Sequence, residues 1–435
     1  MPQEIRKHDT QQHEISVYLP RFERFSREVL GPGQYASAQP LPVSAWLVEG
    51  SERHDAPLPS SADAAAQPHR PVEPGWAWGP KWATCWFRVV GELPPGDRDR
   101  LAIRFSSGTE ATVWSNGAPV RGLDVNRDEV SIREALAPDG ASIDLRVEAS
   151  CNHPWGVVAF DWDHAEDHRR WTGPTPGRRE HCELVRSDDG VRALLRAYDF
   201  ARLLLGELAP ASPRAAQLYH ALTLATELID DTDVSRTAGR AIEPLHAALA
   251  VEPDGAAPIV HAVGHAHIDT AWLWTIRETR RKVIRSWTNA LRLLERNDAF
   301  TFACSQTQQY AWLKDDAPAV FEQISARVGE GRWEPFGGMW VEPDCSVPSG
   351  EALIRQVLHA DRWWRAQFAD RGAQRVLFLP DTFGFPATLP GIMRACGLDT
   401  FITNKLSWNQ FNTMPDTDFV WRGIDGSEVL APQPP

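Results

Sequence analysis

The sequence predicts a multidomain protein: an N-terminal antiparallel β-sandwich, a helical connector, and then an incomplete α/β domain of the β/α-barrel type. Three successive patterns predict this order. Short β-like runs separated by turns come first, followed by apolar residues spaced three or four apart, and then by alternating strand and helix signals. The length of 435 residues suits two or three domains.

The β-sandwich is expected at residues 77–160. Residues 1–76 are expected to form an N-terminal segment and linker, because 51–75 are rich in Pro, Ala and Ser. Asn116 and Gly117 lie between two β-like runs and indicate a hairpin. Such a sandwich can bind carbohydrate or brace the neighbouring domain, and we expect the bracing role.

Helical spacing at 185–252 predicts two or three packed helices without catalytic groups, and the α/β domain is expected at 256–435. Short strands are expected at 259–264 (buried), 300–306, 333–340, 375–384 and 400–408, with a single helix between each strand and the next. Repeated βα units predict a parallel sheet with its ligand site at the carboxyl ends of the strands. Five strands are fewer than the eight of a closed barrel, so we expect the domain to be incomplete.

Composition excludes several classes of protein. A net charge of −13, with no basic run, argues against nucleic acid or an anionic membrane as a partner. The N-terminus lacks the apolar region of a signal peptide, and no window approaches about 18 consecutive apolar residues. The six isolated cysteines contain no C-x-x-C pair, which favours a reducing, cytoplasmic location over a disulfide framework.

The main chemical signal is the stretch GHAHID, which follows the first expected strand. Side chains alternate along a strand, so His265, His267 and Asp269 would point the same way. Asp381 follows the fourth expected strand, at the same edge of the sheet. Imidazole and carboxylate are good zinc ligands, and a catalytic zinc takes three protein ligands and one open position. Each motif alone could equally be a hydrogen-bonded loop or a helix N-cap, but together they favour a metal site.

Several motifs together resemble a known family. Five ordered stretches look like signatures of the class II α-mannosidases, glycoside hydrolase family 38: GHAHIDTAW, SQTQQYAW, GGMWVEPDCSVPSGEALIRQ, LPDTFGFPATLPGIMRACG and FITNKLSWNQFN. They are most similar to the cytosolic/vacuolar and bacterial branch. WGPKWATCWFRV, FSSGTEATVW and EASCN resemble the leading β-domain of that branch, so the resemblance covers about residues 77 to 430.

The resemblance implies a retaining, zinc-dependent exo-α-mannosidase that removes terminal α-linked mannose from oligosaccharides. His267, Asp269 and Asp381 match the zinc ligands of the family, and Asp381 also matches its catalytic nucleophile. Trp272 matches the aromatic residue that stacks on the sugar, and Phe383 lies in the matching pocket. His265 matches a position that is not a ligand and is expected to make a hydrogen bond behind the ligands.

The implied chemistry needs two carboxyl groups, one that attacks the anomeric carbon and another that protonates the departing oxygen. Zinc in the family holds the cis 2- and 3-hydroxyls of mannose. Glu342 and Asp344, after the third expected strand, could line the same pocket or cap their own loop. Ser346 stands where the family often has Asn, which puts one local contact in doubt.

The resemblance also predicts groups that the sequence does not contain. The family has a fourth zinc ligand, a His downstream of the nucleophile, whereas the only His after His267 is His359, upstream of Asp381. The usual acid/base Asp likewise lies beyond this region. We therefore expect the chain to be truncated at its C-terminus, and weakly active or inactive in isolation.

Other interpretations remain open. The chain could be a non-catalytic carbohydrate-binding protein, or the partner-dependent half of a split α-mannosidase that needs a complementary chain; a homo-oligomer is a further alternative. An amidohydrolase-type metal hydrolase is disfavoured, because it would need more histidines at later strand ends. The sequence predicts no linkage specificity, and its ligand set favours zinc over cobalt or manganese.

Overall fold

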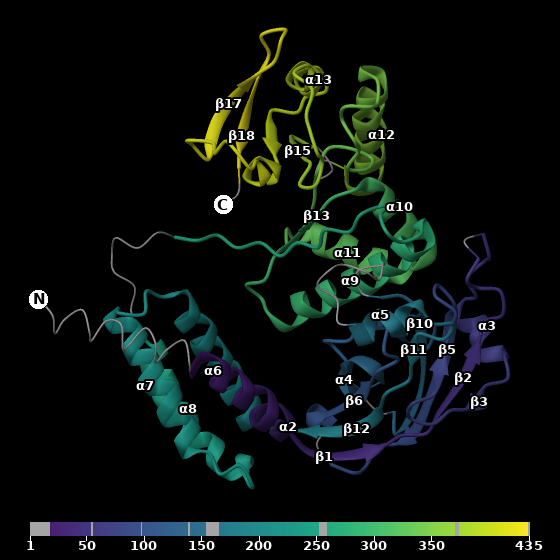
Figure 1. Ribbon diagram of the computed structural model, residues 1–435. Coiled ribbons are helices and arrows are strands. Elements are labelled where there is room, and N and C mark those ends of the chain that lie inside the picture. Colours follow the sequence, from purple (N-terminus) through teal and green to yellow (C-terminus); the bar gives the residue numbers. More distant parts are fainter. Residues whose placement is uncertain are drawn as a thin grey trace, which may run out of the picture.

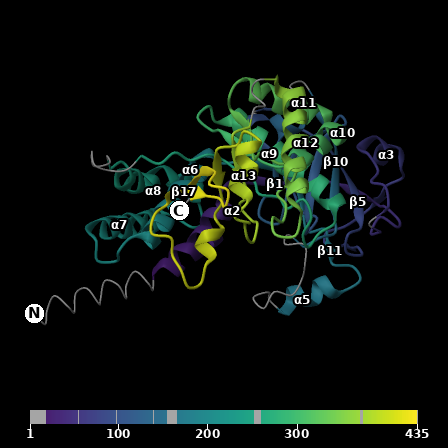
Figure 2. The same ribbon diagram turned by 90° about the horizontal axis from the view of Figure 1, so that it is seen from above.

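Three structural units follow one another along the chain. The computed structural model describes residues 18–433, apart from 54, 97, 138–139, 154–164, 252–258 and 370–373 (Figure 1). A β-sandwich and a helical bundle lie side by side in two views (Figures 1 and 2), and the α/β domain lies above the sandwich in Figure 1. The order of the units is the one that the hydrophobic pattern predicts.

Two antiparallel sheets form the sandwich, with strand orders β1-β12-β6-β9 and β3-β2-β5-β10-β7-β8. The strands are β1 (Tyr35–Pro40), β2 (Val43–Leu47), β3 (Arg70–Pro71), β5 (Thr84–Glu92), β6 (Leu101–Phe105), β7 (Glu110–Ser115), β8 (Ala118–Leu123), β9 (Glu129–Ser131), β10 (Ser142–Ser150) and β12 (Cys182–Ser187). Strands β4 (Ala77–Trp78) and β11 (Gly177–Arg178) form a small separate sheet. Apolar side chains such as Phe87, Ile103 and Val147 fill the core between the sheets.

The sandwich extends beyond the predicted span of 77–160. Strands β1, β2 and β3 lie within the residues predicted to be a segment and linker, which also contain helix α3 (Ser61–Ala66), and β12 lies after residue 160. The reason is that short strands are defined by their partners: β2 pairs with β5, with Val43 opposite Val89. Local composition carries little information about such distant pairing.

The predicted hairpin at Asn116 and Gly117 is confirmed. These two residues join β7 and β8, and their φ angles are +50° and +81°. Positive φ at both central positions is what a two-residue turn of type I′ requires, and Asn-Gly adopts it at low cost.

Three helices occupy most of the span that was predicted to be helical: α6 (Asp189–Glu207), α7 (Pro213–Leu228) and α8 (Val234–Leu249). Each begins after a side chain that accepts a backbone N–H, namely Asp188, Ser212 or Asp233. Their apolar faces share one core with the N-terminal helical turns around Phe22 and Leu30.

The α/β domain contains parallel strands in chain order. Strand β13 (Phe302–Cys304) pairs with β14 (Trp333–Pro335), and β15 (Val376–Phe378), β16 (Thr400–Ile402) and β18 (Glu428–Pro432) pair in parallel. The amide of Phe378 donates to the carbonyl of Gly337 (3.2 Å) and joins the two groups. The antiparallel strand β17 (Asp418–Arg422) covers the last edge. Strands of the described ranges follow the order of a β/α barrel without closing one.

Five helices connect or flank these strands: α9 (Ile276–Arg296), α10 (Thr307–Asp316), α11 (Pro318–Gly329), α12 (Gly350–Phe368) and α13 (Leu389–Ala395). The single helix expected between the second and third strands is wrong, since α10 and α11 meet at Ala317 and Pro318. Proline has no amide hydrogen and disfavours helical angles in the preceding residue, and Ala317 has φ −145°.

The expected buried strand at 259–264 is also wrong. Only Gly264 pairs with a neighbour, as a single parallel bridge to Phe302, and Ile259 and Val260 are 83% and 82% exposed. Burial of a short apolar run requires neighbours on both sides of the sheet, and the run itself does not reveal whether they are present.

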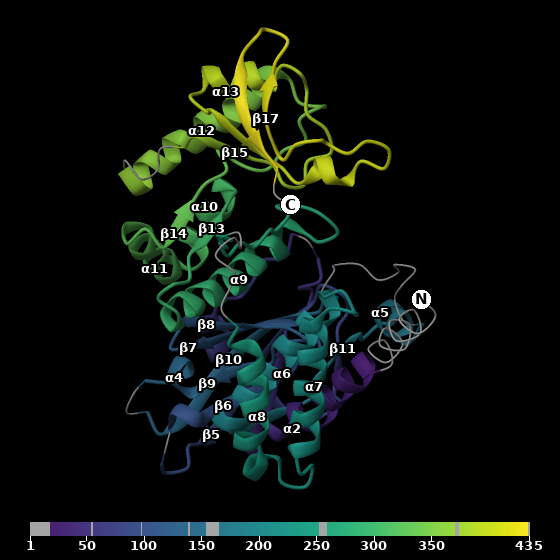
Figure 3. The same ribbon diagram turned by 90° about the vertical axis from the view of Figure 1, so that its left-hand side faces the viewer.

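Helix α9 docks the α/β domain onto the sandwich (Figure 3). The amide of Asn289 exchanges two hydrogen bonds with the backbone of Gly122 in β8, at 2.9 and 3.0 Å. A Cβ atom on Gly122 would lie only 2.7 Å from the carbonyl oxygen of Arg285, so this close approach requires glycine. The contact brings the sandwich directly beneath the helix that follows the metal-ligand motif.

Candidate metal and active site

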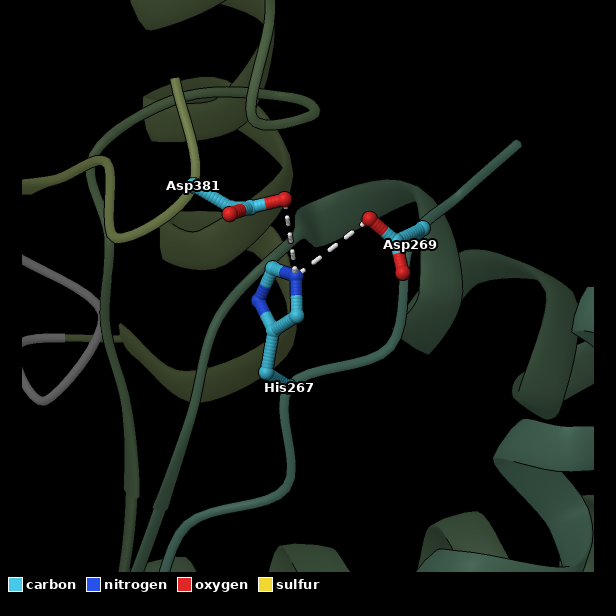
Figure 4. Close-up of side chains that lie close together, drawn as sticks. All are labelled: His267, Asp269 and Asp381. Carbon is cyan, nitrogen blue, oxygen red and sulfur yellow. Dashed lines mark hydrogen bonds and ion pairs between the residues drawn. The ribbon is translucent and has the colours of Figure 1, made fainter. Parts of the chain in front are cut away.

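Three side chains predicted to bind metal converge at one edge of the parallel strands (Figure 4). His267 and Asp269 lie in the loop between the Gly264 bridge and α9, and Asp381 lies in the loop after β15. His267 Nε2 is 3.4 Å from Asp269 Oδ1 and 3.9 Å from Asp381 Oδ2. One potential ligand atom from each residue lies within 4.8 Å of the other two.

The donor set fits a zinc ion. Ligand atoms about 2.1 Å from a tetrahedral ion are separated from one another by about 3.4 Å. The distance from His267 Nε2 to Asp269 Oδ1 matches this value, and the distance from His267 Nε2 to Asp381 Oδ2 is longer, at 3.9 Å. A small movement of the Asp381 side chain would bring its oxygen to the separation expected around zinc. One imidazole nitrogen and two carboxylate oxygens are the ligand chemistry of catalytic zinc.

Glu342 orients the imidazole ring of His267. Its Oε2 lies 3.3 Å from His267 Nδ1, and Ser305 Oγ donates to its Oε1 (2.5 Å). Burial lowers the pKa of His267, but the hydrogen bonds to Asp269 and Glu342 outweigh it and raise the pKa to about 10. The same negative field that holds a proton on this ring would attract a metal cation, with Nδ1 fixed by the carboxylate behind it.

A cavity of about 270 Å³ lies beside these groups. It is lined by His267, Asp269, Thr270, Ala271, Gln306, Val341, Glu342, Asp381 and Thr382. The side-chain amide nitrogens (Nε2) of Gln306 and Gln309 both donate to the backbone carbonyl of Ile268, each at 2.7 Å. The SQTQQ stretch therefore holds the loop that carries His267 and Asp269, a role that sequence reasoning did not assign.

Lys405 is a further residue of the site that sequence reasoning missed. Its Nζ forms an ion pair with Oδ1 of Asp381, the oxygen that does not face His267. Nζ also lies 4.4 Å from the ring centre of Phe383 and 3.2 Å from that of Trp408, and the side chain is only 6% exposed. The two oxygens of Asp381 thus face different cations: a lysine at one and the predicted metal position at the other.

Comparison with known families gives two matches. Residues 257–434 match the model of the glycosyl hydrolases family 38 N-terminal domain, and residues 39–172 match the jelly roll domain of alpha-mannosidase. Residues 257–434 therefore belong to the N-terminal domain family of glycoside hydrolase family 38. The family 38 match includes every residue of the predicted metal site, and the jelly roll match covers most of the sandwich.

Relatives of the chain include alpha-mannosidase 2C1 of Homo sapiens, 36% identical over 86% of the chain. Alpha-mannosidase G of Dictyostelium discoideum is 32% identical over 86%, and an alpha-mannosidase of Saccharomyces cerevisiae is 31% identical over 82%. The chain covers 36%, 34% and 34% of these relatives, about a third of their length.

The two aromatic residues predicted to contact sugar lie at the surface. Trp272 is 47% exposed and packs edge-on against Trp274 at 5.2 Å between ring centres. Phe383 is 74% exposed and packs edge-on against Trp408 at 6.1 Å. Neither is among the residues that line the 270 Å³ cavity, so their roles in sugar binding stay predictions.

His265 and Asp344 make contacts outside the group of three ligands. The Nδ1–H of His265 donates to the carbonyl of Ala303 in β13 (2.8 Å), so this hydrogen bond ties its loop to the sheet, and its predicted role behind the ligands stays a prediction. Asp344 Oδ1 accepts the amides of Ser346 and Val347 at 2.8 and 2.7 Å. Of the two acids after the third strand, Glu342 therefore enters the pocket, and Asp344 caps its own loop.

Proposed function

We propose that the protein is a retaining exo-α-mannosidase that removes terminal α-linked mannose from oligosaccharides with the aid of one zinc ion. The observation that carries this proposal is the placement of Asp381. Its carboxylate shares a pocket with His267 and Asp269 and is held by Lys405. Relatives named alpha-mannosidase support the same reaction. Activity, substrate and any partner chain are proposals, because the chain spans about a third of those relatives.

In the proposed mechanism Asp381 attacks the anomeric carbon of the mannose, the glycosidic C–O bond breaks and the departing oxygen takes up a proton to leave as an alcohol. Water then hydrolyses the covalent glycosyl-enzyme and releases mannose and the carboxylate of Asp381. The two displacements each invert the anomeric centre, so the product retains the original configuration. His267, Asp269 and Asp381 would hold the zinc ion, which when bound would orient the ring through the cis hydroxyls of mannose. Asp269 and Glu342 both contact His267, and we assign neither as the proton donor.

The cytoplasmic location is a proposal as well. It is supported by the six cysteines, all in the described ranges and all unpaired thiols, five of them buried. None of the helices in the described part of the chain is long and apolar enough to cross a membrane.

The test compares aryl α-mannoside hydrolysis by the parent protein, Asp381→Ala and Asp416→Ala. Loss of the nucleophile should lower turnover by on the order of 10⁴-fold, whereas replacement of Asp416, an exposed loop residue, should change little. A chelator should abolish hydrolysis, and added zinc should restore it. Retained turnover in Asp381→Ala would refute the assignment of Asp381 as the nucleophile. Mannose binding by calorimetry without any turnover would favour the non-catalytic alternative, and activity that appears only with a second polypeptide would favour a split enzyme.

A further inference from the structure

A second and larger cavity, of about 640 Å³, lies between the sandwich and helix α9. Its floor is the sheet face that carries Trp86 of β5, Trp114 of β7 and Glu148 of β10. Trp86 lies directly opposite Glu148 in the strand register, and the two indole rings are 6.0 Å apart. Side chains alternate along β5, so the residues beside Trp86 point instead into the core of the sandwich.

The roof of this cavity comes from α9, the first turn of α3 and the preceding loop. Three arginines of α9 line the cavity, and two of them are already paired: Arg280 with Asp316 (2.6 Å), and Arg281 with Glu278 (2.8 Å). Arg277 instead donates from its terminal nitrogens to backbone carbonyls, including those of Arg53 and Ala56. Among the described residues, three arginines and two acids, Glu148 and Asp316, line the cavity, and because two of the arginines are paired they form no cluster of free cations that would favour an anion.

The buried indole N–H of Trp86 and the buried Nε–H of Arg277, on two of the residues that line this cavity, have no partner among the residues that the structure describes. Trp86 is only 1% exposed. Glu148 is 6% exposed, and its carboxylate lies 3.8 Å from Arg281 Nη1. Buried polar groups are normally satisfied, so unpaired donors beside a buried acid mark a place where a polar ligand fits.

We propose that this cavity is a second carbohydrate site, which binds a short neutral oligosaccharide between the sandwich and the α/β domain. Indole rings pack against the apolar faces of sugar rings, while hydroxyl groups donate to a carboxylate and accept from N–H groups. The volume and the mixture of aromatic and few polar groups are those of a small-molecule site at a domain interface. Burial raises the pKa of Glu148, which adds the option of a donated proton to a sugar oxygen.

The proposal is independent of the proposed hydrolysis, and its test keeps the two apart. Isothermal titration of the protein with maltose, cellobiose and α-mannobiose should reveal binding, and the two glucose disaccharides are not substrates of the proposed reaction. Trp86→Phe removes the indole N–H, and Ile276→Trp fills the mouth of the cavity at a residue that is 53% exposed. Each change should weaken binding at least tenfold, with hydrolysis of aryl α-mannoside retained.

Matched controls are Ile276→Val and Trp46→Phe. Trp46 lies opposite Trp86 on the neighbouring strand β2 but outside the cavity, so both controls should bind sugar within twofold of the parent. The proposal is overturned if none of the three sugars binds, if only α-mannobiose binds and Ile276→Trp does not weaken it, or if Trp86→Phe and Trp46→Phe bind equally well. Sugar binding without any mannoside hydrolysis would leave this proposal standing and would count against the proposed enzyme alone.

Discussion

Glu342 can be tested as the residue that positions a metal ligand without reaching the metal itself. Replacement by Gln keeps the shape of the side chain but removes the charge behind His267 Nδ1, 3.3 Å away. We expect zinc affinity to fall about 10- to 100-fold, as for other groups that hydrogen-bond to a metal-bound His. Competition with a chromogenic chelator measures this directly. Glu351→Gln, an exposed acid on α12, is the control, and equal affinity in the two variants would refute the role.

Lys405 can be tested as the residue that holds the nucleophile. Replacement by Met keeps the length and the packing against Trp408 but frees Oδ1 of Asp381. A carboxylate that is no longer fixed spends less time aligned with the anomeric carbon, so kcat should fall about 100-fold with a smaller change in KM. Lys405→Arg retains the cation and should recover part of kcat. A fall confined to KM would show that Lys405 contributes to sugar binding instead.

The sequence predicted the three candidate metal ligands that the structure brings together, because they occupy two recognisable positions, each directly after a strand signal. It could not predict Lys405 in its role, since a single lysine in a loop has no periodicity and its partner Asp381 belongs to another strand end. Whether Glu342 lines the pocket or caps its own loop was left open for the same reason, because its partner His267 lies after a different strand signal. The parallel pairing of β15 with β16 brings the loop of Lys405 next to Asp381.

At the scale of elements, α9 shows what a helical pattern leaves undetermined. Its apolar residues Val283, Trp287 and Leu291 pack in the α/β core, as their spacing predicts. Yet Glu278 and Arg281 are 0% and 3% exposed, because the sandwich covers the opposite face. A charged helix face is normally solvated, and the sequence of α9 alone does not reveal that a second domain buries it.

The buried carboxylate of Glu278 should be essential for this packing. It accepts a hydrogen bond from Arg281 (2.8 Å) and pairs with Arg285. Glu278→Gln removes the counter-charge that the two buried arginines share, and leaves Arg281 only Glu148 at 3.8 Å and Arg285 only Glu110 at 3.1 Å among the described acids, so the free energy of unfolding should fall by about 3 kcal/mol. Glu295→Gln on the same helix breaks an exposed pair with Arg292 and should cost about 0.5 kcal/mol or less. Chemical denaturation compares the two, and equal losses would contradict the assignment.

Elements with strong local signals were predicted, and those defined by distant partners were not. Long amphipathic helices with capping residues, and the Asn-Gly hairpin, are encoded within a few residues. Strands β1 to β3 and the segment at 259–264 depend on whether a neighbour lies alongside, which no window of the sequence records. The break between α10 and α11 had a visible signal, Pro318, that the apolar periodicity on both sides masked.

Across the whole molecule, the sandwich, α9 and the metal loop form one continuous set of contacts. Arg281 in α9 donates to Thr84 and Ser150 of the sandwich at 2.8 and 2.9 Å. Two residues earlier in α9, Thr279 donates to the carbonyl of Thr270 (2.8 Å), the residue directly after Asp269. The bracing role expected for the sandwich thus has a physical route: it fixes the helix whose first turns hold the metal loop.

The same interface should govern how stability depends on pH. Burial raises the pKa of Glu278, but Arg281 and Arg285 outweigh it and hold the pKa below its usual range. Its stabilising effect is therefore fully present above the unfolded-state pKa of about 4.3 and is lost as the pH falls through the lower folded-state value. Glu148, with a raised pKa, acts in the opposite direction and loses its contribution as the pH rises.

We expect the carboxylates with lowered pKa values to outweigh Glu148. Asp128 acts in the same direction as Glu278, because hydrogen bonds from His181 and Arg104 lower its pKa despite its burial. The midpoint temperature of thermal unfolding should therefore fall as the pH is lowered from about 5 to about 3. Calorimetry measures this midpoint, with a chelator present so that metal release does not contribute. In Glu278→Gln the midpoint should start lower and fall less steeply, whereas Glu148→Gln should steepen the fall. Parallel curves for the parent and Glu278→Gln would show that this carboxylate titrates alike in the folded and unfolded states, and that the arginines around it do not stabilise its charge.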